Sequence, residues 1–120
     1  MKHILMIATG GTIASKATAD GLTPQLTSKE LLAEVPELEQ LCRIDTVQLM
    51  NRDSTNINSR DWLQMAACVR AHYDAYDGFV LTHGTDTMAY TAAALSYLIQ
   101  NNAKPVVITG SQKSIFNQDT

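Results

Sequence analysis

The chain has 120 residues, of which 45% are hydrophobic and 18% are charged, so it can form one globular domain or part of one. Its net charge of -3 argues against a general nucleic-acid-binding role, which usually needs a basic surplus. No apolar run approaches the roughly 18 residues that a membrane span needs. The first residues lack a secretory signal pattern, and Cys42 and Cys68 are not clustered, so we expect reduced thiols and a cytoplasmic protein.

Short apolar runs alternate with segments of helical periodicity along the chain. We expect strands at residues 3–8, 43–50, 78–82 and 105–109. Between them we expect a helix that begins with the capping box at 27–30 and is halted by Pro36, and a polar, mobile loop at 20–26 before it. A second helix is capped by Asn58 or Ser59 and carries apolar residues at three- and four-residue steps up to Tyr73. A third runs from Asp86 to about Ile99.

This alternation predicts an α/β fold with a doubly wound, mostly parallel sheet of flavodoxin-like type. The segment 111–120 shows no helix after the last strand, so we expect the sheet to be incomplete at the carboxyl end and one of its faces to be uncovered. The chain 1–120 is therefore interpreted as one domain, a fragment of a longer protein.

Polar turns follow each of the four predicted strands. In parallel sheets the carboxyl ends of all strands lie at one edge, and ligands bind outside them. Each turn supplies hydroxyl groups, which predicts a site for a polar small molecule. The four turns are Thr9-Gly10-Gly11-Thr12, Asp53-Ser54-Thr55, Gly84-Thr85-Asp86 and Gly110-Ser111-Gln112.

Two of these turns carry candidate chemistry, and each also has a purely structural interpretation. Residues 9–14 lack the Gly-Lys-Ser/Thr ending of a P-loop and the third glycine of a dinucleotide fingerprint. Thr12 is either a nucleophile that a neighbouring base must activate or a simple turn cap. Asp86 is either a carboxylate for a substrate ammonium group or the N-cap of the following helix.

Taken together and in order, the motifs resemble those of the asparaginase/glutaminase family. The segment 9–14 (Thr-Gly-Gly-Thr-Ile-Ala) and the segment 82–88 (Thr-His-Gly-Thr-Asp-Thr-Met) resemble its two signature segments. Asp53-Ser54-Thr55 looks like its Asp-Ser substrate loop, and 105–111 looks like its next strand and loop. The resemblance covers essentially the whole chain.

The resemblance implies that L-asparagine is hydrolysed to L-aspartate and ammonia through a threonine nucleophile. Thr12 matches that nucleophile, and Thr85 and Asp86 match two members of a Thr–Lys–Asp constellation. It further implies that Asp86 binds the α-amino group of the substrate and that Ser54 binds its α-carboxylate. The remaining candidate substrate-binding residues are Gly11, Asp53, Thr55, Gly84 and Ser111.

No metal or organic cofactor is implied, and the three histidines show no metal-ligand spacing. His83 is interpreted as a structural hydrogen-bonding residue. The expected partner is a small molecule, asparagine or also glutamine, rather than a nucleic acid or a membrane. The resemblance implies a homodimer or homotetramer for the full-length protein.

The chain departs from the family pattern in two places. Leu22 stands where many members have a tyrosine that covers the site. The catalytic lysine of the family and its smaller second domain lie beyond residue 120, and Lys113 does not match that lysine. We therefore expect the isolated chain to be inactive.

Two other functions remain open at this stage. One is the amidase module of a tRNA-dependent amidotransferase, which would share both threonine motifs but would normally carry an added amino-terminal domain. The other is a non-catalytic, flavodoxin-like binding module, which would be recognised by a bound flavin.

Overall fold

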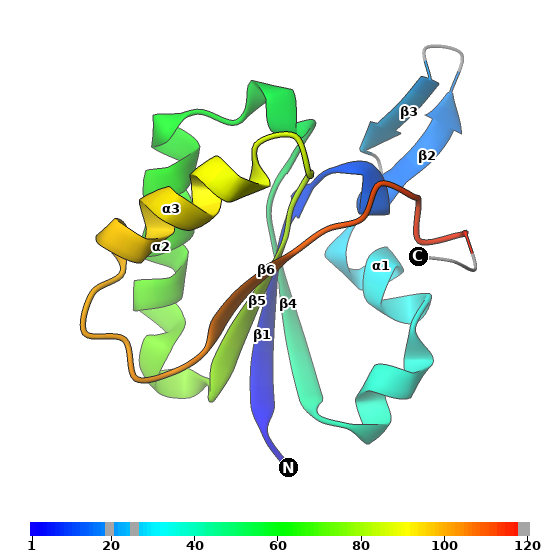
Figure 1. Ribbon diagram of the computed structural model, residues 1–120. Helices are drawn as coiled ribbons and strands as arrows, with labels where there is room; N and C mark the ends of the chain where they lie inside the picture. Colours follow the sequence, from blue (N-terminus) through cyan, green and yellow to red (C-terminus); the bar gives the residue numbers. More distant parts are fainter. Residues whose placement is uncertain (19–20, 25–26, 118–120) are drawn as a thin grey trace.

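Four parallel strands form the central sheet of the protein (Figure 1). The computed structural model describes residues 1–18, 21–24 and 27–117. The strands lie in the order β4-β1-β5-β6, so the chain starts in the sheet interior and builds outward first to one side and then to the other. This confirms the predicted doubly wound parallel sheet. Their bounds are β1 His3–Gly10, β4 Arg43–Arg52, β5 Gly78–Thr82 and β6 Val106–Thr109.

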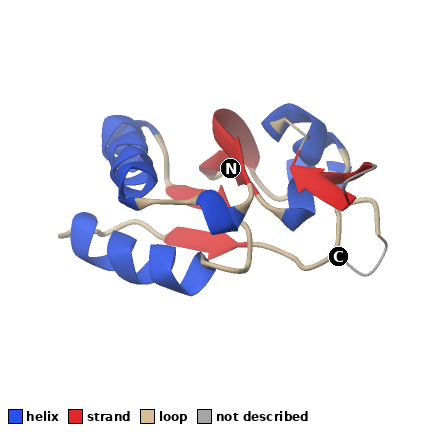
Figure 2. Ribbon diagram, turned by 90° about the horizontal axis from the view of Figure 1, so that it is seen from above, coloured by secondary structure: helices blue, strands red, loops and turns tan. Residues whose placement is uncertain are grey.

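Helices cover both faces of the sheet, which explains why β1 is apolar on both of its sides. Leu5 and Ile7 pack into a core with α2 (Ser59–His72) and α3 (Met88–Leu98). Met6 points to the opposite face and packs with Leu31 of α1 (Ser28–Ala33). Figure 1 shows α2 and α3 on one side of the strands and α1 on the other, and Figure 2 shows the same layers from above.

The helix starts follow the local sequence signals at two of three positions. A capping box of Thr27 with Glu30 begins α1, as predicted. Asn58, one of the two predicted caps, begins α2, and Asp61 completes a capping box there. The predicted start of α3 at Asp86 is wrong, because α3 begins at Met88. The backbone N–H of Asp86 donates to the Ser54 hydroxyl at 3.2 Å, which holds this residue in the preceding loop.

The region predicted as a polar loop, residues 20–26, contains the second strand of an antiparallel hairpin. Its strands are β2 (Ser15–Thr18) and β3 (Gly21–Pro24), in a register that pairs Ala17 with Leu22. The loop prediction is therefore wrong for Gly21–Pro24. Glycine and proline have weak strand propensity, but a proline at the end of an edge strand does not interrupt the ladder. The structure does not describe positions 19, 20, 25 and 26 or the side chain of Leu22. The predicted mobility of this loop therefore stays a prediction.

Two strands extend further than the sequence indicates. β1 reaches Gly10 and β4 reaches Arg52, because these two residues pair after a register shift that follows Ala8. The turn-like segment after Met50 is thus partly strand. Short 3-10 helices complete the described elements: Thr12–Ala14, Pro36–Gln40, Ser54–Asn56 and Tyr73–Ala75.

One face of the sheet is open near its last strand. Val107 of β6 is 49% exposed, on the face opposite to α2 and α3. An apolar hollow of about 310 Å³ lies on this face, with Met6, Val80 and Val107 in its wall. The expected uncovered face after Ile108 is therefore present in the part of the chain that the structure describes.

We expect Leu81→Ala to destabilise the fold far more than Leu63→Ala. Leu81 is fully buried between β5 and the α2–α3 layer, whereas Leu63 is 54% exposed on α2. Loss of the buried side chain leaves a cavity and should lower the free energy of unfolding by about 2–5 kcal/mol. The exposed substitution should change it by about 0.5 kcal/mol or less. Urea denaturation of both variants measures this, and equal effects would contradict the packing.

Candidate active site

The predicted site residues lie at the carboxyl edge of the sheet, where the strand order reverses. β1 and β5 are neighbours in the sheet, but the chain leaves them toward opposite sides. Loops that diverge in this way leave a crevice, which is the usual ligand site of such folds. The loop after β1 carries Thr12, and the loop after β5 carries Thr85 and Asp86.

A small polar cavity of about 50 Å³ occupies this position. It brings together all the residues proposed from sequence except Thr55 and Ser111, and it adds Ser15. Thr12 and Thr85, which are 73 positions apart in the sequence, thus line one cavity, as predicted. The lining consists of Gly11, Thr12, Ser15, Asp53, Ser54, Gly84, Thr85 and Asp86.

The strand-end loops approach each other so closely that side chains are excluded at two contacts. A Cβ atom on Gly11 would lie 2.5 Å from the backbone nitrogen of Gly84. A Cβ atom on Gly84 would lie 2.5 Å from Cβ of Ser54. Gly11 also has a φ of 89°, in the left-handed region that favours glycine. The glycines of the two motifs therefore permit the loop contact that forms the cavity.

Gly11 is anchored by its own backbone groups. Its N–H donates to the Arg52 carbonyl at 3.0 Å, and its carbonyl accepts from the Ser15 hydroxyl at 2.8 Å. Thr12 follows as the first residue of a 3-10 helix and is half-buried. Ser15 was not proposed from sequence. The signal that could have found it is a hydroxyl three residues after Thr12, since a 3-10 turn brings residues at that spacing to one side.

Ser54 joins the loop after β4 to the loop after β5. Its side chain is almost fully buried, at 3% exposure. Its hydroxyl oxygen accepts from the Asp86 N–H at 3.2 Å, and its carbonyl accepts from the Thr87 hydroxyl at 2.9 Å. The hydroxyl hydrogen of Ser54 is not used in the bond to Asp86, because there the oxygen accepts.

Two predicted residues lie outside the cavity lining. The hydroxyl and N–H of Thr55 both donate to the Asp53 carboxylate at 3.1 Å, which forms a local turn. The hydroxyl of Ser111 accepts from the N–H of Lys113 at 3.1 Å. Thr55 and Ser111 therefore stabilise their own loops, and Lys113 is exposed and does not line the cavity.

The electrostatic character of the cavity is negative. Two carboxylates, of Asp53 and Asp86, stand among its lining residues, whereas no lysine, arginine or histidine does among the described ones. Such a lining favours a ligand that carries an ammonium group. Asp86 is exposed, which leaves its carboxylate accessible to a ligand. The described lining supplies Thr12 with no obvious proton acceptor of the lysine or histidine type.

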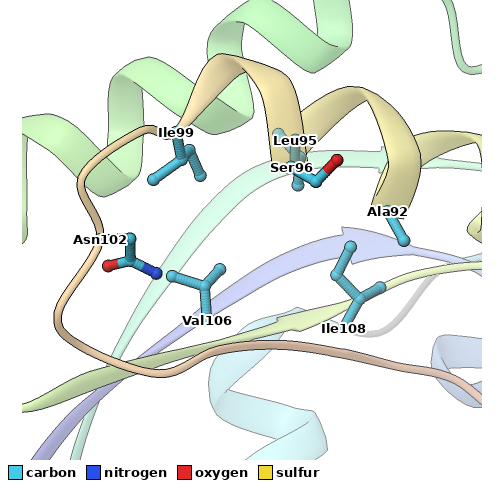
Figure 3. A pocket seen from close by; sticks show the side chains of 7 residues that line it. All are labelled: Ala92, Leu95, Ser96, Ile99, Asn102, Val106 and Ile108. Carbon is cyan, nitrogen blue, oxygen red and sulfur yellow. The ribbon is translucent and has the colours of Figure 1, made fainter.

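A second cavity is larger, but few of its lining groups could bind or react with a polar ligand. It lies between α3 and β6, has a volume of about 270 Å³, and is lined mostly by apolar side chains (Figure 3). Ser96 and Asn102 provide its few polar side-chain groups. It is a packing gap at the edge of the sheet. Among the described residues no cluster of metal ligands is found, and no helix is both long and apolar enough to span a membrane.

Comparison with known proteins places these observations in a family. Residues 3–120 match the description "Asparaginase, N-terminal". The chain belongs to the asparaginase family. It is 43% identical to an L-asparaginase of Thermococcus kodakarensis over 113 residues, which make up 93% of this chain and 34% of that protein. The solved structure of the thermostable L-asparaginase from that organism superposes with a TM-score of 0.87 at 41% identity, over 98% of this chain and 36% of that one.

A second kind of relative is equally similar. One of the subunits of a glutamyl-tRNA(Gln) amidotransferase from Archaeoglobus fulgidus is 42% identical over 116 residues, which make up 95% of this chain and 28% of that protein. This asparaginase-family chain thus spans about a third of the length of the relatives that it matches. The family is established, whereas its members differ in the reaction that they serve.

We expect Gly84→Ala to destabilise the protein more than Gly78→Ala. The added methyl group at position 84 would overlap Cβ of Ser54 and approach its backbone nitrogen at 3.1 Å. At position 78 the nearest atom is a side-chain carbon of Pro105 at 3.0 Å, which can shift. Overpacking should cost about 1–3 kcal/mol at Gly84 and less at Gly78. Thermal or urea unfolding measures the difference, and equal stability would show that the loop contact is adaptable.

Proposed function

We propose that this chain is the amino-terminal part of an amidohydrolase that converts L-asparagine into L-aspartate and ammonia. The observation that carries the proposal is the cavity at the carboxyl edge of the sheet, which Thr12, Thr85 and Asp86 all line. Membership of the asparaginase family supports the reaction class. Glutamine, which is one methylene longer, is expected to be a poorer substrate that is not fully rejected, because one methylene changes binding by only about 1–3 kcal/mol.

In the proposed reaction Thr12 is the nucleophile. Its oxygen attacks the side-chain amide carbon, the hydroxyl proton is taken up by a base, and a tetrahedral intermediate forms. The C–N bond then breaks, the leaving nitrogen takes up a proton, and ammonia departs from an acyl-enzyme ester. Water hydrolyses this ester to release aspartate and restores the Thr12 hydroxyl. No step in this sequence needs a metal or a redox cofactor.

The other residues of the cavity bind and orient the substrate in this proposal. The Asp86 carboxylate pairs with the α-ammonium group, which the negative lining favours. The Ser54 hydroxyl hydrogen, left over from its bond to Asp86, donates to the α-carboxylate. Thr85 stands beside Asp86 in the same loop, and in this proposal both belong to the catalytic constellation that also includes a lysine.

In this proposal, the base that takes up the Thr12 proton comes from a part of the protein beyond this chain. The described cavity lining contains no lysine, and the relatives are about three times as long as the chain. We therefore propose that the catalytic lysine and a second domain are supplied from beyond residue 120. The full-length protein is then expected to be a cytoplasmic homodimer or homotetramer.

A second candidate function is supported by the amidotransferase relative. The same threonine chemistry would then release ammonia for amidation of a charged tRNA. Steady release of free ammonia from asparagine in the absence of tRNA favours the hydrolase, and dependence on glutamyl-tRNA favours the amidotransferase. A flavin-binding module is disfavoured, because the carboxylates of Asp53 and Asp86 would repel the flavin phosphate.

We expect Thr12→Ala in the full-length protein to lower kcat for asparagine by roughly ten-thousand-fold, since it removes the nucleophile. Thr12→Ser keeps a hydroxyl and should retain measurable turnover. Thr27→Ala is the matched control, because it removes a methyl and a hydroxyl from the cap of α1, away from the cavity. A coupled ammonia assay measures kcat, and near-normal turnover of Thr12→Ala would exclude the covalent mechanism.

We expect the isolated 120-residue chain to turn over asparagine at least roughly 1,000-fold more slowly than the full-length protein, because members of an activating constellation act as a unit. The open apolar face beside Val107 should also favour association of the isolated chain. The assay compares both proteins at equal site concentration, with Thr12→Ala as the background. Activity of the isolated chain within tenfold of the full-length protein would show that a complete site lies within these residues.

A further inference from the structure

A buried chain of hydrogen bonds leads from the outer helices to the candidate site. The indole Nε1 of Trp62, on α2, lies 2.8 Å from Oγ1 of Thr91, on α3. The same oxygen lies 2.9 Å from Nε2 of His83, which follows β5 directly. Nδ1 of His83 lies 2.6 Å from the carbonyl oxygen of Gly84. Thr91 and His83 are fully buried, so water does not compete for the two bonds of the His83 ring, whereas the bond from Trp62 is partly buried.

The chemistry of the two ends sets the direction of every bond in this chain. An indole nitrogen can only donate, and a carbonyl oxygen can only accept. Nδ1 of His83 therefore carries a proton and donates to Gly84. If the imidazole is neutral, its Nε2 must accept from the Thr91 hydroxyl, which in turn accepts from Trp62. All three side chains are then satisfied at once.

The neutral ring is also the form that the surroundings favour. Burial away from water lowers the pKa of His83 below its ordinary value, although the bond to the Gly84 carbonyl opposes this in part. A protonated ring would donate from both nitrogens and would leave the Thr91 hydroxyl without the nitrogen acceptor that the neutral ring offers. His83 is thus held as the neutral tautomer with its proton on Nδ1.

The bond to Gly84 fixes the peptide that begins the site loop. The backbone N–H of His83 donates to the Thr109 carbonyl at 2.9 Å, which holds the residue against β6. The Gly84 carbonyl and the Thr85 N–H belong to one planar trans peptide and point in opposite directions. When His83 binds this carbonyl, the Thr85 N–H is turned away from the buried imidazole. The glycine itself is wedged against Ser54.

We infer that Trp62, Thr91 and His83 are positioning residues, whose hydrogen-bond chain orients the Gly84–Thr85 peptide and with it Thr85 and Asp86 in the cavity. This inference rests on the proposed function for its catalytic consequence only. These three residues act through Gly84, and they are not among the described residues that line the cavity. The chain also makes Trp62, the single tryptophan of the protein, a reporter of the site loop.

Two amide substitutions of His83 distinguish the role of its Nδ1 hydrogen bond from that of its Nε2 hydrogen bond. In His83→Asn the side-chain amide lies near the position of Nδ1 and can still donate to Gly84. In His83→Gln it reaches the position of Nε2 and can still accept from Thr91. Each variant loses one buried hydrogen bond, so urea denaturation should show similar losses of stability. The two variants are therefore matched in stability, but only His83→Asn keeps the hydrogen bond to the Gly84 carbonyl.

The first readout needs no enzymatic activity. In the full-length protein we expect His83→Gln to shift the backbone amide resonances of Thr85 and Asp86, and His83→Asn to leave them near their original positions. Equal shifts in both variants would overturn the inference. The second readout is turnover by the full-length protein, where kcat of His83→Gln should fall on the order of 100-fold below that of His83→Asn. Equal kcat values would also overturn it.

A second pair of variants applies if substitutions of His83 prevent folding. Thr91→Val removes the hydroxyl but keeps the shape, and Thr91→Ser keeps the hydroxyl. We expect only Thr91→Val to change the His83 ring-nitrogen chemical shifts and the Trp62 indole N–H resonance. Unchanged signals in Thr91→Val would contradict the chain of bonds. If the wild-type protein releases no ammonia, the proposed function fails, while the resonances still decide the positioning role.

Discussion

The whole candidate site depends on one steric constraint, the close approach of three strand-end loops at the carboxyl edge of the sheet. Gly11 meets Gly84, and Gly84 meets Ser54, at distances that leave no room for a Cβ atom. These contacts join loops that follow three different strands, β1, β4 and β5. The cavity therefore forms only because these three strands are neighbours in the sheet. A side chain at either glycine would separate the loops and so remove the cavity between them.

Polar bonds hold the loops at this distance. The N–H of Gly11 is bound by the Arg52 carbonyl, and the N–H of Asp86 by the Ser54 hydroxyl. Arg52 in turn lies 3.7 Å from the buried Asp61, the residue that completes the cap of α2. Buried polar groups destabilise a protein unless they are paired, so the network around the cavity makes the loop geometry specific as well as stable.

The chemical groups in the cavity are those that bind and attack a polar amide, and they come from the strand-end loops and their short 3-10 turns rather than from the α-helices. Hydroxyls and carboxylates dominate the lining, from Thr12 to Asp86. The helices contribute indirectly, since α3 supplies the buried Thr91 that binds His83, and α2 supplies the Trp62 that binds Thr91. Such an arrangement is expected in a doubly wound sheet, where the packed strands and helices hold the polar loops in place.

The sequence by itself determined the α/β class, the parallel strands, the caps at Thr27 and Asn58, and the family, because these depend on local periodicity and on long ordered motifs. The tertiary structure alone decided which polar turns share a cavity. Ser15 entered the lining through a 3-10 turn, whereas Thr55 and Ser111 bond within their own loops. It also decided that Gly21–Pro24 is a strand, because this weakly strand-forming segment pairs with the neighbouring Ser15–Thr18. The start of α3 after Asp86 depends on a distant partner, since the Asp86 N–H is bound by Ser54. Contacts such as that of Gly11 with Gly84 join residues far apart in the chain, and no local pattern encodes them.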